Sequence, residues 1–352
     1  MAIREILGAD DFPAGTRYPT FQLLGKGVLP GVAQGVTSAN TSIAAVNGRN
    51  WLRITGSVNA SLTSNLSAAK ITLDEMKTKK IYGGFRYVVP NNAVTKTADP
   101  ILRLTFVGFA TVYNLLTEND LQRSTDEVYI KYLIDAVNLQ ATVWIDGTLI
   151  RTVALAAGIS VMTDINLIYG QLSGAVASET HCYQDFYWEV DTFDTDGVVA
   201  GRLGPVKVKS AKVAGTVLAA GWTVSDGSNP DVVLDTLGLA PNTELTPTIR
   251  TSPDETVSSV GFAKPTAELS IKAVSVEVFA YRDTGTAPTV QAQVKQGANL
   301  STKKTLTVPT LDFNRGAASD RLGCFNTDLA GQPWTNDSID ALEVLINSKT
   351  GA

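Results

Sequence analysis

Histidine and cysteine are nearly missing from this sequence of 352 residues, which contains one histidine, His181, and two cysteines, Cys182 and Cys324. A structural zinc site uses four nitrogen or sulfur ligands, so such a site would have to draw its ligands largely from carboxylates. A Ser-His-Asp or Cys-His mechanism would have to use His181. Two cysteines exclude a disulfide framework, although one bridge between them remains arithmetically possible. The sequence is therefore not typical of a metalloenzyme or a triad hydrolase.

Positive charge and long apolar segments are also scarce. The chain has 29 Lys and Arg residues against 34 Asp and Glu residues, for a net charge of -5. It therefore offers no basic excess for a phosphate backbone, and we expect no nucleic-acid partner. The longest apolar run, residues 153–162, is about half of the ~20 residues that a membrane-spanning helix needs. The first residues lack the apolar segment of a signal peptide, so we expect no membrane partner and synthesis in a cytoplasm.

The residues that are abundant give the pattern of an all-β protein. Apolar residues make up 44% of the chain and charged residues 18%, which is enough to form a core. β-Branched and aromatic residues recur in short alternating runs separated by turn residues. The clearest case is a hairpin within residues 140–153, because Asp146-Gly147 supplies the two positive φ angles of a type I′ turn. Helical periodicity is confined to residues 73–80 and 112–123, which are too short for a bundle.

The length and the turn residues predict two folded domains and an N-terminal arm. A chain of 352 residues exceeds what one hydrophobic core usually organises. Glycine and proline interrupt residues 1–50 so often that we expect an irregular, extended arm with one or two short strands. β-Rich segments fill residues 51–197 and 198–352, and polar turn residues crowd the junction. In the second region we expect a strand at residues 232–237 and a helical turn after Trp334 that leads into the last strand.

Several sequence segments, in their order along residues 80–352, resemble those of a structural protein of tailed-bacteriophage particles. The first region carries ATVWIDGTLIRTV and, as its last strand, CYQDFYWEVD, and the second carries RLGPVKV, IKAVSVEVFAYRDTG and PWTNDSIDALEVLI. The resemblance implies a jelly-roll domain of the concanavalin/laminin-G type in residues 51–197 and a C-terminal β-sandwich domain in residues 198–352. It also implies a location in the virion, after synthesis in the host cytoplasm.

The resemblance further implies a non-enzymatic structural role, as an accessory component of the tail, the neck or the capsid exterior. The partners would be other virion proteins and copies of the chain itself, in a homo-oligomer. An irregular arm fits this role because it can wrap a neighbouring subunit. An alternative is a carbohydrate-binding module that attaches to host-surface glycan, and a third is a polysaccharide-cleaving enzyme on the same fold. We expect no catalytic residues and no cofactor-binding residues.

Asp191, Asp194 and Asp196, with Gly197 beside them, are the metal candidates of the sequence. Clustered carboxylate oxygens around a glycine turn are typical of calcium sites, and the resemblance supports the idea because laminin-G-type folds often carry calcium at a rim. The full EF-hand spacing with its terminal glutamate is missing. The alternative is an interdomain turn whose aspartates cap backbone amides. Calcium is thus the one cofactor that the sequence suggests.

Three aromatic residues, Trp144, Tyr183 and Tyr187, are candidates for stacking against a sugar ring. Strand alternation predicts that Tyr183 and Tyr187 share one face while Phe186 and Trp188 share the other. One of these two sets must then belong to the core. Trp144 has the same ambiguity, and core packing is the alternative for each of the three candidates.

The histidine and the cysteines have simpler expectations. We expect His181 to be half-exposed at a strand edge rather than to bind a metal or to act in catalysis. We expect Cys182 and Cys324 to be free, buried thiols rather than a bridge, since they fall in different predicted domains and the place of synthesis is reducing.

Overall fold

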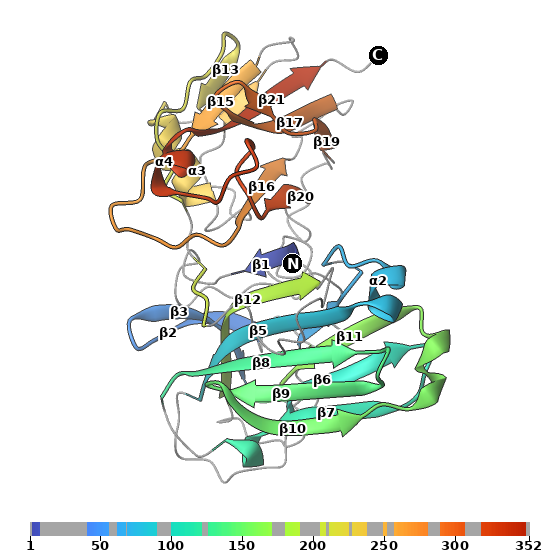
Figure 1. The fold of residues 1–352 in the computed structure, drawn as a ribbon. Coiled ribbons are helices and arrows are strands. Elements are labelled where there is room, and N and C mark those ends of the chain that lie inside the picture. The colour runs from blue at the N-terminus through green and yellow to red at the C-terminus, as the bar shows by residue number, and fades with distance from the viewer. Residues whose placement is uncertain are drawn as a thin grey trace. The chain divides into compact units, whose positions relative to one another are not determined.

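The structure is a computed structural model of the chain. It describes residues 2–7, 41–55, 62–67, 69–89, 100–121, 126–170, 180–190, 205–208, 211–224, 227–237, 249–251, 257–280, 289–306 and 318–349. The chain divides into two compact units, Met1–Val208 and Lys209–Ala352. The regular structure in both units is almost entirely antiparallel β-sheet (Figure 1), which confirms the predicted all-β class.

The first unit is a sandwich of two sheets. An eight-stranded sheet has the order β10-β9-β8-β5-β12-β3-β2, with β1 paired to β12, and a four-stranded sheet has the order β4-β11-β6-β7. The strands are β1 (Ala2–Leu7), β2 (Thr41–Val46), β3 (Arg49–Thr55), β4 (Leu62–Asn65), β5 (Lys80–Val88), β6 (Pro100–Val107), β7 (Val112–Thr117), β8 (Val128–Asp135), β9 (Gln140–Ile145), β10 (Thr148–Ala154), β11 (Asp164–Tyr169) and β12 (Thr180–Val190). Buried residues of both sheets, such as Phe85 and Leu104, form one cluster. The core therefore lies between the two layers.

Two tight turns in the eight-stranded sheet have the geometry of type I′ hairpins. Asp146 and Gly147 have φ angles of 47° and 83° and join β9 to β10, as the sequence predicts. The Asp146 carboxylate also accepts a hydrogen bond from the backbone N–H of Tyr129 at 2.8 Å, which ties the turn to the neighbouring strand β8. Asn47 and Gly48, with φ angles of 50° and 75°, join β2 to β3 in the same way. Positive φ at both central positions is what such turns require.

One of the two predicted helical segments is a helix and the other is not. Helix α2 (Leu73–Thr78) begins at a capping box in which Thr72 and Glu75 bond each other's backbone N–H groups. The segment 112–123 is expected to be helical, but its described residues, 112–121, contain strand β7 followed by a 3-10 turn at Glu118–Asp120. Pairing with β6 decided this outcome, because a helix of this length has little stability by itself. In the described part of the chain, no helix has the length and apolarity to cross a membrane.

The N-terminal segment differs from the arm that the sequence predicts. Its described parts, Ala2–Leu7 and residues 41–50, are strands of the eight-stranded sheet. Ile3 and Ile43 on these strands are buried. Residues 8–40 lie outside the described residues. The short strands expected within residues 1–50 are thus present as β1 and β2. The expectation of an arm separate from the first sandwich is wrong for both described ends, because their backbone groups complete that sheet.

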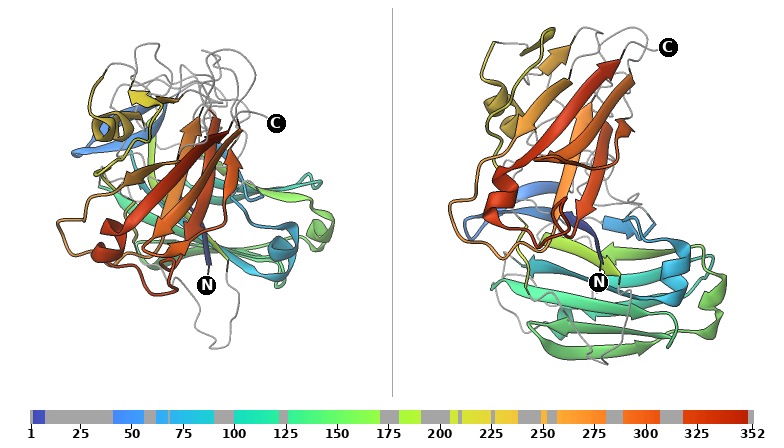
Figure 2. Two further views of the ribbon diagram at one scale, coloured as in Figure 1. Left: turned by 90° about the horizontal axis from the view of Figure 1, so that it is seen from above. Right: turned by 45° about the horizontal axis from the view of Figure 1, so that its top comes forward.

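The second unit contains, in its described residues, a five-stranded sheet and two two-stranded sheets. Its elements are β13 (Trp222–Val224), α3 (Pro230–Leu237), β14 (Ile249–Thr251), β15 (Val257–Gly261), β16 (Val274–Ala280), β17 (Thr289–Gln296), β18 (Asn299–Leu300), β19 (Lys304–Leu306), β20 (Ala318–Phe325), α4 (Asn336–Asp340) and β21 (Leu342–Lys349). The long pair β17–β21 is drawn in orange to red in Figure 2. Val294 and Val344 from the large sheet share a core with Val276 of β16.

Residues at the helix starts explain why one secondary-structure prediction in this unit is confirmed and another is wrong. The predicted helical turn before the last strand is α4, which starts at a Thr335–Ser338 capping box and leads into β21. The predicted strand at residues 232–237 is wrong, since these residues belong to helix α3. Pro230 stands at the start of this helix, where its fixed φ favours the first turn. The Asn229 side chain accepts a hydrogen bond from the Asp231 N–H at 2.9 Å, so the start signals outweigh the β-branched valines.

Candidate functional site on the outer face of the eight-stranded sheet

A bulge at Asp185 decides which aromatic residues of β12 reach the outer face, that is, the face turned away from the four-stranded sheet. Asp185 has a φ of 53°, and the pairing with β5 shifts between Gln184 and Tyr187. Tyr183, Phe186 and Trp188 consequently all belong to the core cluster. The predicted alternation, with Tyr183 opposite Phe186, is therefore wrong. Asp185 and Tyr187 are the residues that the bulge turns outward.

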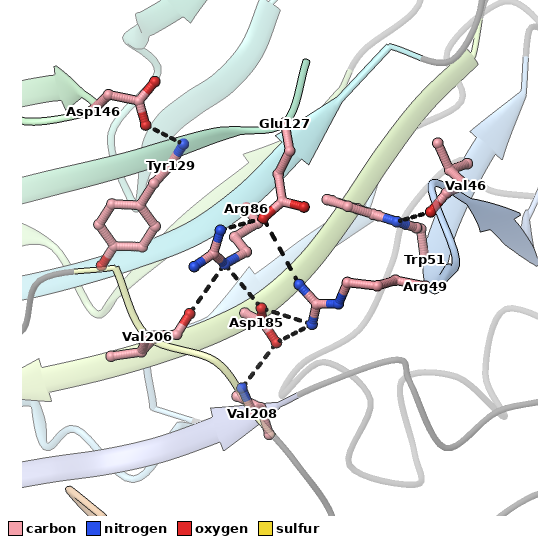
Figure 3. Close-up of polar contacts among 10 residues, drawn as sticks. All are labelled: Val46, Arg49, Trp51, Arg86, Glu127, Tyr129, Asp146, Asp185, Val206 and Val208. Carbon is pink, nitrogen blue, oxygen red and sulfur yellow. Dashed lines mark hydrogen bonds and ion pairs between the residues drawn. The ribbon is translucent and has the colours of Figure 1, made fainter. Parts of the chain in front are cut away.

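Asp185 lies at the centre of an ion network (Figure 3). One nitrogen of Arg49 donates to both carboxylate oxygens at 3.0 and 3.2 Å, and Nε of Arg86 lies 3.1 Å from Oδ2. The backbone N–H of Val208 donates to Oδ1 at 2.9 Å. Glu127 forms an ion pair with Arg86 and lies 3.8 Å from Arg49. Two cations, Arg49 and Arg86, thus balance two anions, Glu127 and the Asp185 carboxylate, and Asp185 has no exposed surface.

The network holds the end of the first unit on the outer face. Arg86 Nε donates to the carbonyl of Val206 at 3.2 Å, while Asp185 accepts from Val208. Burial raises the pKa of the Asp185 carboxyl, and the Val208 N–H and the two arginines only partly offset that effect. Removing one member of such a buried network would leave the others without partners. We interpret the network as a fixed support at one end of the outer face.

Two tyrosines meet next to this support. The hydroxyls of Tyr129 and Tyr187 are 3.1 Å apart, and Gly84 lies beneath them. A Cβ atom at position 84 would lie 2.6 Å from Cε1 of Tyr187 and 2.7 Å from the Tyr129 hydroxyl. Glycine is therefore required for this close approach. Burial raises the pKa of Tyr129 to about 12 and also raises the pKa of Tyr187, so neither phenol is suited to proton transfer at neutral pH.

A row of side chains crosses the outer face toward the edge strand β10. Lys131 on β8 stands opposite Trp144 on β9, and Trp144 stands opposite Leu149 on β10. The Lys131 ammonium lies 4.9 Å from the centroid of the Trp144 ring. Lys131 and Trp144 are half-buried, whereas Leu149 is 58% exposed. We call Lys131, Trp144 and Leu149 the Trp144 patch.

Of the three predicted sugar-stacking residues, only Trp144 retains accessible surface. Tyr183 and Tyr187 are 0% and 1% exposed, so neither ring offers a face to a ligand, and these two candidates are wrong. Their burial has different causes. Tyr183 packs in the core between the sheets, where its ring lies 5.6 Å from that of Phe85, whereas Tyr187 is buried on the outer face.

The predicted metal ligands Asp191, Asp194 and Asp196 lie outside the described residues. Among the residues that the structure does describe, no group of three or more His, Cys, Asp or Glu side chains is arranged to hold a metal ion. Calcium binding at residues 191–197 stays a prediction.

His181 is not half-exposed at an edge as expected, because β12 lies between β5 and β3 and turns this side chain into the interior. It is 0% exposed. Its Nδ1 lies 2.6 Å from the Tyr87 hydroxyl, and its Nε2 lies 3.4 Å from a carboxylate oxygen of Glu118. The histidine thus joins β5, β12 and the 3-10 turn in a polar contact within the core.

Neither Cys182 nor Cys324 forms a disulfide bond in the structure, in agreement with the expectation. Cys182 is buried, as predicted, whereas Cys324 is half-buried. Burial raises the pKa of the Cys182 thiol to about 12. A thiol with so high a pKa is a poor nucleophile at neutral pH.

Comparisons with known proteins find remote similarity in fold. No family model matches the sequence, and no curated protein matches it. Among solved structures, the chain is similar to an alginate lyase mutant in complex with alginate trisaccharide, with 10% identity, a TM-score of 0.37 and coverage of 53% of this chain and 98% of the other. The lectin UEA-II complexed with galactose has 11% sequence identity to this chain and a TM-score of 0.32, and the match covers 54% of this chain and 100% of the lectin. A sialidase has 10% sequence identity to this chain and a TM-score of 0.27, and the match covers 46% of this chain and 18% of the sialidase.

Proposed function

We propose that the first unit is a carbohydrate-binding module and that the Trp144 patch is its binding site. The observation that supports this function is the half-buried indole of Trp144 on the outer face. An indole has a broad apolar surface and a polar N–H, and tryptophan is therefore common where a binding surface is partly wet. The apolar faces of sugar rings pack on such surfaces.

The position of Trp144 in the sheet suits a binding site. Its strand β9 pairs along its whole length with both β8 and β10, and the type I′ turn at Asp146-Gly147 follows directly. Strands fix side chains more precisely than loops do. Because the ring is already held in place, little conformational entropy would be lost when a ligand binds.

The same face favours binding over catalysis. Glycoside hydrolysis uses a pair of carboxyl groups, one of which donates a proton. On the described part of this face, Asp185 and Glu127 are held by Arg49 and Arg86, and Glu189 is only 3% exposed. The proposed function therefore includes no bond-breaking step.

A glycan array probed with the purified protein tests the proposal. We expect saturable binding of the unmodified chain to at least one glycan class and a loss of at least tenfold in affinity for Trp144→Ala. Trp222→Ala is the matched control, since Trp222 is a half-buried tryptophan of the second unit, and it should bind as the unmodified chain does. Absence of binding to every glycan, or equal binding by the Trp144 variant, would overturn the proposal.

We also propose that the protein acts in a tailed-phage particle, where glycan binding would serve host attachment. The supporting observation is the order of two compact β units along the chain, which is the order that the sequence resemblance implies. Its partners would be other virion proteins and copies of itself. Mass spectrometry of purified particles provides the test: the polypeptide should be present in stoichiometric amount, and its absence would contradict this role.

A further inference from the structure

Lys131 is a partly desolvated cation without an ion pair in the part of the chain that the structure describes. Its side chain is half-buried, and burial lowers its pKa. The interaction that the structure gives its ammonium is the contact with the Trp144 ring at 4.9 Å. A cation over an indole is stabilised by the ring quadrupole, but that contact does not neutralise the charge.

The acidic groups near Lys131 differ from it in exposure. Glu189 on β12 is the carboxylate whose charge acts on Lys131, and Glu189 is only 3% exposed. Asp185 is completely buried and is paired with two arginines. Lys131 is half-buried and is therefore more exposed on the outer face than these two carboxylates. A ligand that binds at the Trp144 patch would lie next to the positive charge of Lys131.

We propose that the Trp144 patch binds an anionic saccharide, with a sugar ring against Trp144 and a carboxylate or sulfate group at the ammonium of Lys131. This inference rests on the proposed carbohydrate binding and adds the class of ligand. The anion supplies the ion pair that Lys131 lacks among the described residues, in a partly desolvated setting where a charge-assisted contact is stronger than in water. Leu149, 58% exposed beside the ring, extends the apolar surface toward the strand edge.

Paired ligands that differ only in charge test the inference on the full-length protein by calorimetric titration. Oligogalacturonate is compared with its methyl ester, and dextran sulfate with dextran, so that the carboxylate and the sulfate are tested separately. We expect at least one charged ligand to bind at least tenfold more tightly than its neutral partner. This preference should fall as sodium chloride is raised from about 0.05 to 0.5 M, because salt screens exposed charges.

Two variants test whether Lys131 causes the preference for charged over neutral ligands. Lys131→Met keeps the aliphatic stem and removes the charge, so it should bind charged and neutral ligands equally. Lys77→Met is the matched control, because Lys77 is an exposed lysine on helix α2, and it should retain the preference. Circular dichroism checks that both variants fold.

The outcomes separate this inference from the function on which it rests. Equal binding of charged and neutral ligands by the unmodified chain, with loss of both in Trp144→Ala, would overturn the anionic class and leave carbohydrate binding in place. A charge preference that persists in Lys131→Met would also overturn the inference. Absence of binding to all four ligands and to the glycan array would overturn both proposals.

Discussion

Arg49 and Asp185 are 136 positions apart in the sequence, yet one guanidinium nitrogen of Arg49 donates to both carboxylate oxygens of Asp185. Arg49 follows the Asn47-Gly48 turn, and Asp185 occupies the bulge of β12. The pair therefore links a hairpin turn to an irregularity in the central strand. The Val208 N–H, which bonds the same carboxylate, adds the end of the first unit to this link.

We predict that Asp185→Gly exposes the segment around Lys207 to trypsin while the sandwich stays folded. Glycine adopts the positive φ of position 185 without strain, so the variant removes the carboxylate and keeps the bulge. The backbone N–H of Val208 then loses its acceptor. The segment around the exposed Lys207 should therefore unfold locally more easily. Limited proteolysis followed by mass spectrometry should show cleavage after Lys207 at least fivefold faster than in the unmodified chain.

Asp120→Asn is the control for this experiment. Asp120 is also paired with an arginine, Arg151, at 2.7 Å, but it makes no contact with residues 205–208 in the described structure. Its proteolysis at Lys207 should match that of the unmodified chain. Equal cleavage rates in the Asp185 and Asp120 variants would show that the network does not hold this segment.

We predict that Gly84→Ala destabilises the first unit by about 1–3 kcal/mol, the usual cost of overpacking. The new methyl group would lie 2.6 Å from the Tyr187 ring and 2.7 Å from the Tyr129 hydroxyl. Urea denaturation of both proteins measures the difference. Adding Tyr129→Phe to the variant removes the second clash and should restore part of the loss, and an unchanged midpoint for Gly84→Ala would contradict the close approach.

The phenol of Tyr129 should make stability depend on alkaline pH. Its pKa is raised from 10.0 to about 12 in the folded state, so the folded chain holds this proton more tightly than the unfolded chain does. The stabilisation from Tyr129 is complete below pH 10 and is lost as the pH rises through about 12. Urea titrations between pH 9 and about 11.5 should show a shallower decline for Tyr129→Phe than for the unmodified chain, and identical slopes would refute the shifted pKa.

His181 and Tyr87 should be energetically coupled. Their polar atoms are 2.6 Å apart in the core, and a buried polar group that loses such a partner costs about 1–3 kcal/mol. We predict that His181→Phe and Tyr87→Phe each destabilise the chain and that the double variant costs less than their sum. A coupling energy of about 1 kcal/mol or more is expected from a double-mutant cycle. Additive losses would mean that the contact contributes nothing.

Much of the fold could be predicted because its signals are local. Asp146-Gly147 specified a hairpin turn by its own backbone preferences, and the segment after Trp334 carried the capping residues of a short helix. The site was harder to predict. Trp144 and Lys131 lie on neighbouring alternating strands, so strand alternation combined with the register across residues 136–139 could have brought them together, but nothing local indicates that register.

The sequence by itself determined the all-β class, the type I′ turn and the scarcity of metal-binding and nucleophilic side chains, since these follow from composition and from preferences of adjacent residues. Only the tertiary structure decided that Tyr183 and Tyr187 are buried while Trp144 keeps accessible surface. The bulge at Asp185 reverses the alternation of β12, and it is supported by Arg49, Arg86 and Val208, which are distant in sequence. Contacts of that kind depend on how the strands pair, and the sequence of a single strand does not indicate which strands will lie beside it.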